Sequence, residues 1–336
     1  MAPRVDVHAH LMPTGLFAEL PTGLTASEDP GRGEIALTVA ARNGATGRGA
    51  PLNLRDADVH RERQCERGVD VTLLGPWIDM IAAPVDAPTQ AALCRVVNRH
   101  LATTVAGRTD AHFLAALPDL DGGAATDVLA EALELGAAGG MLAANTAEGT
   151  LARSDLDALW GAAERAGAPL VLHPGNFSPP PRMDRFFLVN LVGNPFETTL
   201  AVGSLLGAEV PDRFGDLDVV LVHGGGFFPY QYARIDAGFR RWPTLRDRAG
   251  APPADHLRWF AYDTVLFDDA PTRYLLDLVG DDRVMAGSDC PFAMSDHRPF
   301  AAPESLGLDA AGTERVLGAN AIDLFGIPVP ETPRSA

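Results

Sequence analysis

Four short apolar runs in this 336-residue chain each end at a side chain that can bind a metal ion. The runs lie at residues 4–7, 169–172, 218–222 and 283–286, and the side chains at or just after their ends are His8 with His10, His173, His223 and Asp289. Runs rich in Val and Leu with Gly or Pro close by are typical of buried parallel strands. In a closed parallel barrel the carboxyl ends of the strands surround one mouth. The pattern therefore predicts a (β/α)8 barrel with one shared site.

The spacing of the first two histidines indicates chelation. His8 and His10 are two residues apart, so both side chains leave the same face of an extended strand. Imidazole and carboxylate groups are suitable ligands for zinc, and an open three-histidine-plus-aspartate set is typical of catalytic sites. A single histidine at a strand end is more often an ordinary polar residue, but four such ends in one chain are not independent. We expect His8, His10, His173 and Asp289 to bind one metal ion.

Charge and residue usage exclude several classes of function. The net charge of −17 argues against nucleic acid or an anionic membrane as a partner, since both require a basic surface. The chain contains no lysine, so all 27 basic residues are arginine. Schiff-base chemistry, pyridoxal phosphate linkage, a P-loop lysine and a carbamylated lysine bridging two metals are thereby excluded. A single-metal site is the simplest remaining design, and an anionic substrate must be bound by arginines.

Composition indicates a folded cytoplasmic protein. Hydrophobic residues make up 46% of the chain and charged residues 21%, which is enough to form one large barrel or two ordinary domains. The sequence has no apolar stretch near the roughly 18 residues of a membrane span and begins directly in a strand signal without a leader. Cys65, Cys94 and Cys290 lack CxxC spacing, which favours reduced thiols in a reducing compartment.

Strand and helix signals alternate along the whole chain. We expect eight strands, near residues 4–7, 69–75, 111–118, 138–142, 169–172, 218–222, 257–263 and 283–286. We expect helices near 55–67, 87–106, 124–135, 154–166, 196–206, 228–241 and 270–279, and a closing helix near 310–325. This order predicts an α/β fold, a (β/α)8 TIM barrel in one domain over residues 1–336. Residues 12–54 are too polar for a core element and are expected to form a small insertion after the first strand.

Longer motifs carry a resemblance to a known family. They are VDVHAH at 5–10, VLHPG at 171–175, GNPFETT at 193–199, VLVHGGGFFPYQYARID at 220–236, FAYDTVLFD at 260–268 and RVMAGSDCPF at 283–292. The set resembles the amidohydrolase superfamily, and within it the branch related to aminocarboxymuconate-semialdehyde decarboxylase. The resemblance covers nearly the whole chain. It implies one zinc ion per chain, with manganese as the alternative, on the four ligands named above.

The resemblance also implies roles for residues around the metal. His223 matches the catalytic base. Arg234 matches an arginine that reaches into a neighbouring subunit's site and binds the substrate carboxylate, which implies a homodimer or higher homo-oligomer. A second substrate arginine falls on Arg48 by ungapped counting, with Arg42 as a competitor. Other candidates for the pocket wall, each equally consistent with packing or exposure, are Trp77, Met80, Phe177, Arg182, Arg185 and Phe292.

The function implied is non-oxidative decarboxylation of a small unsaturated or aromatic carboxylate, either muconate-semialdehyde-like or hydroxybenzoate-like. A metal ion stabilises the carbanion left when carbon dioxide departs, while His223 takes or relays a proton. Asp289 is the candidate acid if the carbon is protonated directly. The same residues serve hydrolases or hydratases of ring-cleavage products and lactones, and a further alternative is a metal-bearing barrel without catalysis. Gly224, Gly225 and Gly226 fit either close substrate access or a tight turn.

Five histidines remain outside the predicted site. His60, His100, His112 and His256 lie on helices or at strand starts, the end of a barrel associated with stability. His297 follows Asp289 by eight residues and is a candidate for the barrel mouth.

Overall fold

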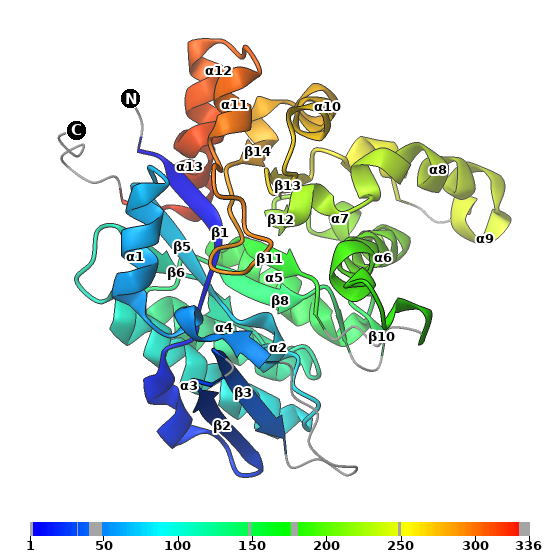
Figure 1. Ribbon diagram of the computed structural model, residues 1–336. Coiled ribbons are helices and arrows are strands. Elements are labelled where there is room, and N and C mark those ends of the chain that lie inside the picture. Colours follow the sequence, from blue (N-terminus) through cyan, green and yellow to red (C-terminus); the bar gives the residue numbers. More distant parts are fainter. Residues whose placement is uncertain are drawn as a thin grey trace.

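Figure 1 shows the computed structural model of the chain, which describes residues 3–31, 33–39, 49–146, 149–175, 181–247 and 250–328. Arg42, Arg48 and Phe177, three of the candidate pocket residues, lie outside the described residues.

Eight parallel strand positions form the barrel. In order around it they are β1 (Val5–Leu11), β5 (Val71–Pro76), β6 (Ala111–Phe113) continued by β7 (Ala115–Ala116), β8 (Gly140–Ala143), β11 (Leu170–His173), β12 (Val219–Leu221), β13 (Phe260–Asp263) and β14 (Val284–Met285). The last position is joined to the first: the Val7 amide donates to the Ala286 carbonyl at 3.0 Å, and the His10 amide donates to the Cys290 carbonyl at 2.7 Å. The barrel predicted from the sequence is confirmed.

The first strand shows how the sequence orients its side chains. All seven residues of β1 are buried, yet apolar and polar residues alternate along it. Because side chains two residues apart point to the same face of a strand, His8 and His10 share one face, while the pairing register of β1 shifts between Asp6 and Ala9. His8 and His10 contact His173 from β11, so both histidines lie on the inner face of the barrel.

Helices follow the strands as the periodicity predicts. The longer ones are α1 (Ala57–Glu66), α3 (Ala87–Val105), α4 (Gly122–Glu134), α5 (Asp157–Ala166), α6 (Asn194–Gly207), α8 (Phe228–Arg241) and α10 (Asp269–Val279). Asp56, Asp86, Asp121 and Asp268 cap four of them by accepting backbone N–H groups of the first turn, as short polar N-caps do. The predicted closing helix is divided into α12 (Ala310–Glu314), a π-helical turn (Arg315–Ala319) and α13 (Asn320–Phe325).

Shorter elements complete the described chain. They are α2 (Ile78–Ile81), α7 (Val210–Arg213), α9 (Pro243–Arg246), α11 (Ala301–Ser305) and the paired strands β9 (Asn145–Thr146) and β10 (Gly149–Thr150). The seventh barrel strand starts three residues later than predicted, because Pro252 and Pro253 begin a 3-10 turn (Pro253–His256). His256 therefore lies in that turn and not in a strand.

The segment after β1 is more ordered than its composition indicates. It contains a 3-10 helix (Thr14–Glu19) and an antiparallel sheet of β2 (Leu24–Asp29), β3 (Glu34–Val39) and β4 (Gly49–Pro51), seen at the bottom of Figure 1. Leu24, Ile35 and Leu37 are buried and belong to the main core. The expectation that this segment is too polar for a core element was wrong, because a strand with one solvated face needs only every second residue to be apolar.

Of the helices described, none combines the length and the apolar character that a membrane span requires.

Candidate metal centre

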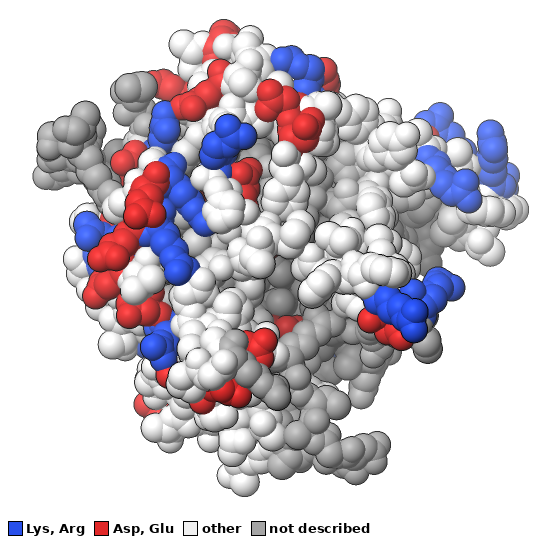
Figure 2. Space-filling model, in the orientation of Figure 1, with Lys and Arg blue, Asp and Glu red and all other residues white. Residues whose placement is uncertain are grey.

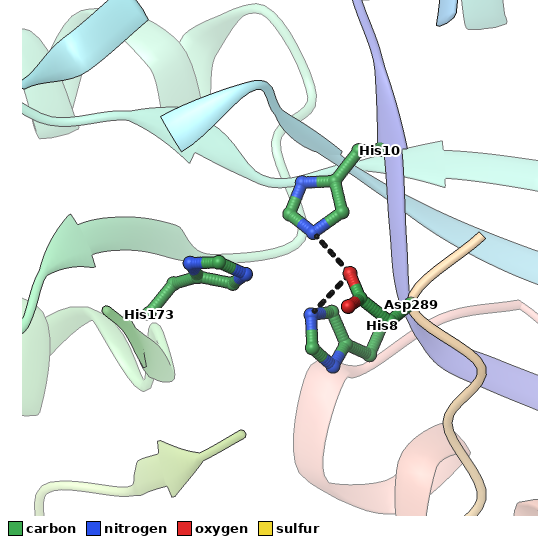
Figure 3. A group of neighbouring side chains, drawn as sticks. All are labelled: His8, His10, His173 and Asp289. Atoms are coloured by element: carbon green, nitrogen blue, oxygen red, sulfur yellow. Dashed lines mark ion pairs between the residues drawn. The ribbon is translucent and has the colours of Figure 1, made fainter. Parts of the chain in front are cut away.

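The structure brings the four predicted metal ligands together at the barrel mouth (Figure 3). His8 and His10 come from β1, His173 is the last residue of β11, and Asp289 follows β14. One ligand atom from each residue lies within 4.8 Å of the others. All four residues are buried.

Each histidine ligand is oriented by a bond to its outer nitrogen. His8 Nδ1 lies 2.6 Å from Asp263 Oδ2, His10 Nδ1 lies 2.8 Å from the Pro76 carbonyl, and His173 Nδ1 lies 2.9 Å from the Pro174 carbonyl. These oxygens only accept hydrogen bonds, so each Nδ1 carries the hydrogen and each Nε2 presents a lone pair. Fixing the tautomer in this way is how proteins orient histidines for a metal.

The inward-facing atoms have no other partner. His8 Nε2, His10 Nε2, His173 Nε2 and Asp289 Oδ1 are all buried, and within the described residues none makes a hydrogen bond. Asp289 Oδ1 lies 3.4 Å from His8 Nε2 and 3.2 Å from His10 Nε2. Orphaned buried polar atoms are costly unless something binds them. Three imidazole lone pairs and one carboxylate oxygen therefore fit a divalent metal ion.

For His173 and Asp289 the electrostatics favour the form that binds a metal. Burial and the neighbouring histidines hold the pKa of His173 well below its usual value, so its imidazole is neutral at physiological pH. Burial alone would raise the pKa of Asp289, but His8, His10 and His223 hold it well below the usual value. Metal ligands must be deprotonated, so both shifts prepare the site for a cation.

His223 lies beside this cluster. Its ring centroid is 5.0 Å from that of His8 and 5.3 Å from that of His173, and its Nε2 is 3.5 Å from Asp289 Oδ2. His223 directly follows the apolar run at residues 218–222, which contains β12. It adopts a left-handed backbone with φ of 54°. Such a conformation is uncommon for a residue other than glycine and occurs preferentially at functional sites.

The three glycines after His223 are explained by the turn. All three have positive φ, between 58° and 79°. A Cβ at Gly224 would meet Leu266, one at Gly225 would meet Tyr262, and one at Gly226 would meet the Pro195 backbone. The tight-turn interpretation of this run is therefore supported, since the space a side chain would need is occupied by protein atoms.

Two buried carboxylates that the sequence analysis did not single out support the ligands. Asp6 Oδ1 accepts the amides of His8 and Ser288, each at 3.0 Å, while its other oxygen accepts the Ser288 hydroxyl at 2.5 Å. Asp6 thus ties β1 to the loop of Asp289. Asp263 ends β13 and contacts His8. The strand-end rule that found the ligands would also have found Asp263, at the end of FAYD.

The other predicted site residues lie next to the centre, in the core or on the surface. Trp77 is buried directly after β5. The Phe292 ring lies 5.2 Å from the His10 ring, so it borders the centre. Arg234 is exposed on α8. Met80 is fully buried in the core, which agrees with the packing alternative, and Arg182 and Arg185 are exposed.

Two of the histidines predicted to be structural make contacts outside the centre. His100 Nε2 lies 3.1 Å from Glu19, and His256 Nε2 lies 3.3 Å from Asp212. His297, the candidate for the barrel mouth, is exposed and lies 3.0 Å from an Arg67 nitrogen. His60 is buried on α1.

His60 predicts a specific acid sensitivity. Burial lowers its pKa to about 4 from 6.5, so the unfolded chain takes up a proton first as the pH falls. The free energy of unfolding of metal-free protein should therefore decrease between pH 6.5 and 4, by roughly 3 kcal/mol from this group. Chemical denaturation across this pH range should show a flatter pH dependence for His60→Gln than for the wild type. Parallel curves for the two proteins would contradict the assignment.

Comparisons with known proteins agree with this geometry. The family model described as amidohydrolase matches residues 5–327, which is nearly the whole chain. The chain belongs to the amidohydrolase family. Among solved structures of similar fold, a dihydroxybenzoic acid decarboxylase from Polaromonas sp. JS666, with bound manganese and the inhibitor 2-nitroresorcinol, superimposes with a TM-score of 0.77. Its sequence is 20% identical, and the match covers 97% of each chain.

Two curated relatives of this amidohydrolase are also decarboxylases. A 2-amino-3-carboxymuconate-6-semialdehyde decarboxylase from Dictyostelium discoideum is 32% identical over 58% of this chain. The match spans 55% of that protein, about half its length. A 6-methylsalicylic acid decarboxylase from Penicillium expansum is 24% identical, with 87% of this chain and 86% of the relative covered.

Proposed function

We propose that this amidohydrolase is a metal-dependent, non-oxidative decarboxylase of a small unsaturated or aromatic carboxylate. The observation that carries the proposal is the convergence of three histidine Nε2 atoms and one aspartate oxygen, with His223 alongside. The relatives support it, because the similar proteins named above decarboxylate aromatic acids or a muconate semialdehyde.

In this proposal His8, His10, His173 and Asp289 hold one divalent ion per chain. Zinc suits the imidazole-rich ligand set, and manganese is supported by the metal bound in the structurally similar Polaromonas enzyme. The bound ion would supply Lewis-acid stabilisation of negative charge on a substrate oxygen. The low pKa of Asp289 supports its use as an ionised ligand.

The chain's own groups handle the proton and the substrate. The bond between the substrate carbon and its carboxylate breaks, the electron pair stays on that carbon, carbon dioxide leaves, and a proton replaces it. His223 is positioned to hold or relay that proton, because it is the imidazole beside the four ligands and is not one of them. Phe292 and Trp77 would form an apolar wall next to His10. This wall would exclude water from the developing carbanion.

Carbon dioxide release tests the reaction class. Purified metal-loaded protein would be incubated with 6-methylsalicylate, 2,6-dihydroxybenzoate and a carboxylated muconate semialdehyde, and carbon dioxide would be measured. We expect release from at least one of these acids. Hydrolysis of lactones or ring-cleavage products without carbon dioxide would replace the proposal with hydrolase chemistry, and no turnover at full metal occupancy would favour a non-catalytic barrel.

A homodimer in which Arg234 enters the partner's site is part of the proposal. Aromatic side chains are exposed on α6, α8 and α10, at Phe196 (45%), Tyr230 (76%) and Tyr274 (41%), and Trp242 directly after α8 is 63% exposed. The rings of Tyr230 and Tyr274 lie 6.2 Å apart, so α8 and α10 share this surface. Figure 2 shows a group of basic side chains over the outer part of α8 and α9, next to uncharged surface over α6. Exposed apolar surfaces of this kind mark interaction sites.

Subunit mixing tests the shared site. Arg234→Ala and His223→Ala should each be nearly inactive as homodimers, because the first loses the carboxylate contact and the second loses the base. A mixed dimer contains one site with both residues intact. An equal mixture should therefore recover about a quarter of wild-type activity, since half of the dimers are mixed and half of their sites are whole. Absence of recovery despite proven subunit exchange would mean that Arg234 does not act across the interface.

We further propose that residues 1–336 work as one barrel domain with residues 12–54 as its insertion, and that the enzyme is cytoplasmic. The extent of the family match, residues 5–327, supports the first statement. The buried thiols Cys94 and Cys290 support a reducing compartment.

A further inference from the structure

Asp263 makes contacts to two parts of the active site at once. It is the last residue of β13 and is fully buried. Its Oδ2 lies 2.6 Å from His8 Nδ1, on the ligand cluster. Its Oδ1 accepts the Gly224 amide at 2.8 Å and the Val265 amide at 3.1 Å. The first of these amides belongs to the peptide directly after His223.

We propose that Asp263 is a positioning residue that couples a metal ligand to the turn carrying the catalytic base. The inference rests on the proposed function for the role of His223, whereas the part concerning His8 depends on the metal site alone. In this scheme one carboxylate oxygen fixes the tautomer of His8, and the other fixes the backbone that aims the His223 ring.

The numbers of donors and acceptors explain how Asp263 fixes the tautomer of His8. A carboxylate accepts only, so it holds the His8 hydrogen on Nδ1 and leaves Nε2 free to bind the metal. His8 is completely enclosed, so water does not replace the carboxylate as a partner.

The backbone conformation at His223 explains how Asp263 positions the turn. His223 has φ of 54°, a conformation that surrounding contacts must maintain. The bond from the Gly224 amide to Asp263 Oδ1 anchors the following peptide. With that peptide fixed, His223 Nε2 stays 3.5 Å from Asp289 Oδ2 and faces the site.

An asparagine at this position cannot satisfy both partners. It offers one acceptor oxygen and one NH₂ group, while Asp263 faces three donors. The two backbone amides of Gly224 and Val265 cannot change their role, so the amide oxygen should turn toward them. The NH₂ group then faces His8 Nδ1, which becomes the acceptor, and the His8 hydrogen moves to Nε2. That tautomer has no lone pair for the metal.

Gly287 packs closely against both His8 and Asp263. A Cβ added at Gly287 would lie 3.0 Å from the His8 Cβ and 3.1 Å from the Asp263 Cβ. Gly287→Ala therefore keeps every hydrogen-bonding group but displaces both partners by a few tenths of an ångström. It provides a second variant that acts on the same contact without removing the carboxylate.

The experiment measures metal affinity without substrate. Metal-free wild type, Asp263→Asn, Gly287→Ala and the control Asp119→Asn would be titrated with Zn²⁺ and with Mn²⁺ against a competing chelator. Asp119 is equally buried, but its carboxylate accepts from Gln90. We expect Asp263→Asn to raise the metal Kd by roughly 10- to 100-fold and Gly287→Ala to raise it less, with the control unchanged. At saturating metal, Asp263→Asn should still lower kcat by about 10-fold with little change in KM, because the turn has lost its anchor.

The outcomes distinguish a failure of the role proposed for Asp263 from a failure of the proposed decarboxylase function. Wild-type metal Kd values in a folded Asp263→Asn protein would overturn the His8 half, and a normal kcat at saturating metal would overturn the turn half. If Asp263→Asn does not fold, an unchanged Kd in Gly287→Ala overturns the inference. Failure of the wild type to release carbon dioxide would refute the proposed function alone, since the metal titration requires no substrate.

Discussion

Replacing His173 with alanine should remove both the bound metal and the activity. The wild type should carry about one ion per chain, and the variant well under a fifth of that, because one of four converging ligands is lost from a site whose remaining atoms have no alternative partner. Loss of Lewis-acid stabilisation worth several kcal/mol should lower turnover by roughly 10³-fold. Elemental analysis and the carbon dioxide assay on the same sample measure both effects.

A matched histidine variant serves as the control. His100 lies on α3 and contacts Glu19, so His100→Ala removes an imidazole without touching the centre. Its metal content and turnover should equal those of the wild type. Metal near two ions per chain in the wild type, or unchanged metal in His173→Ala, would contradict the mononuclear site.

Replacing His223 should separate chemistry from metal binding. His223→Asn is the suitable variant, because asparagine tolerates the left-handed backbone that this position requires. The four ligands remain, so metal content should stay near the wild-type value. The kcat should fall by about 10²-fold or more, the size usual for a positioned proton-transfer group.

The direction of any change in metal content decides how this variant is interpreted. If kcat falls while metal content is constant, His223 acts on the proton and not on the ion. If metal content falls in parallel with kcat, His223 is a fifth ligand. A variant that turns over normally with full metal would remove His223 from the mechanism.

Local periodicity was sufficient to predict most of the barrel. Buried parallel strands need continuous apolar runs and the surrounding helices need an apolar stripe, and both patterns depend on nearby residues only. β11 and β12 were located in this way within two residues. The small sheet after β1 was missed, because Ile35 and Leu37 signal a strand only by alternation, within a segment whose overall composition is polar.

The types of the residues at the strand ends, and their spacing in the sequence, also predicted which ligands would converge. A parallel barrel places every strand's carboxyl end around the same mouth, so a histidine at the end of β11 must approach one on β1 although 163 to 165 positions separate them in the sequence. The glycines after His223 were ambiguous from the sequence. Only the neighbouring atoms of Leu266, Tyr262 and Pro195 favour the tight-turn explanation.

The sequence by itself determined the barrel, the ligand types and the strand ends that carry them, because these depend on residue chemistry and short-range period. The tertiary structure alone decided which nitrogen of each histidine faces the centre. That choice depends on Asp263 and on the Pro76 and Pro174 carbonyls. Asp263 lies at a strand end, but its position in the sequence does not show that it contacts His8. Carbonyls are present at every residue, so no local pattern marks the two that bind His10 and His173. Hydrogen-bond partners depend on distance and direction in space, which only the folded chain specifies.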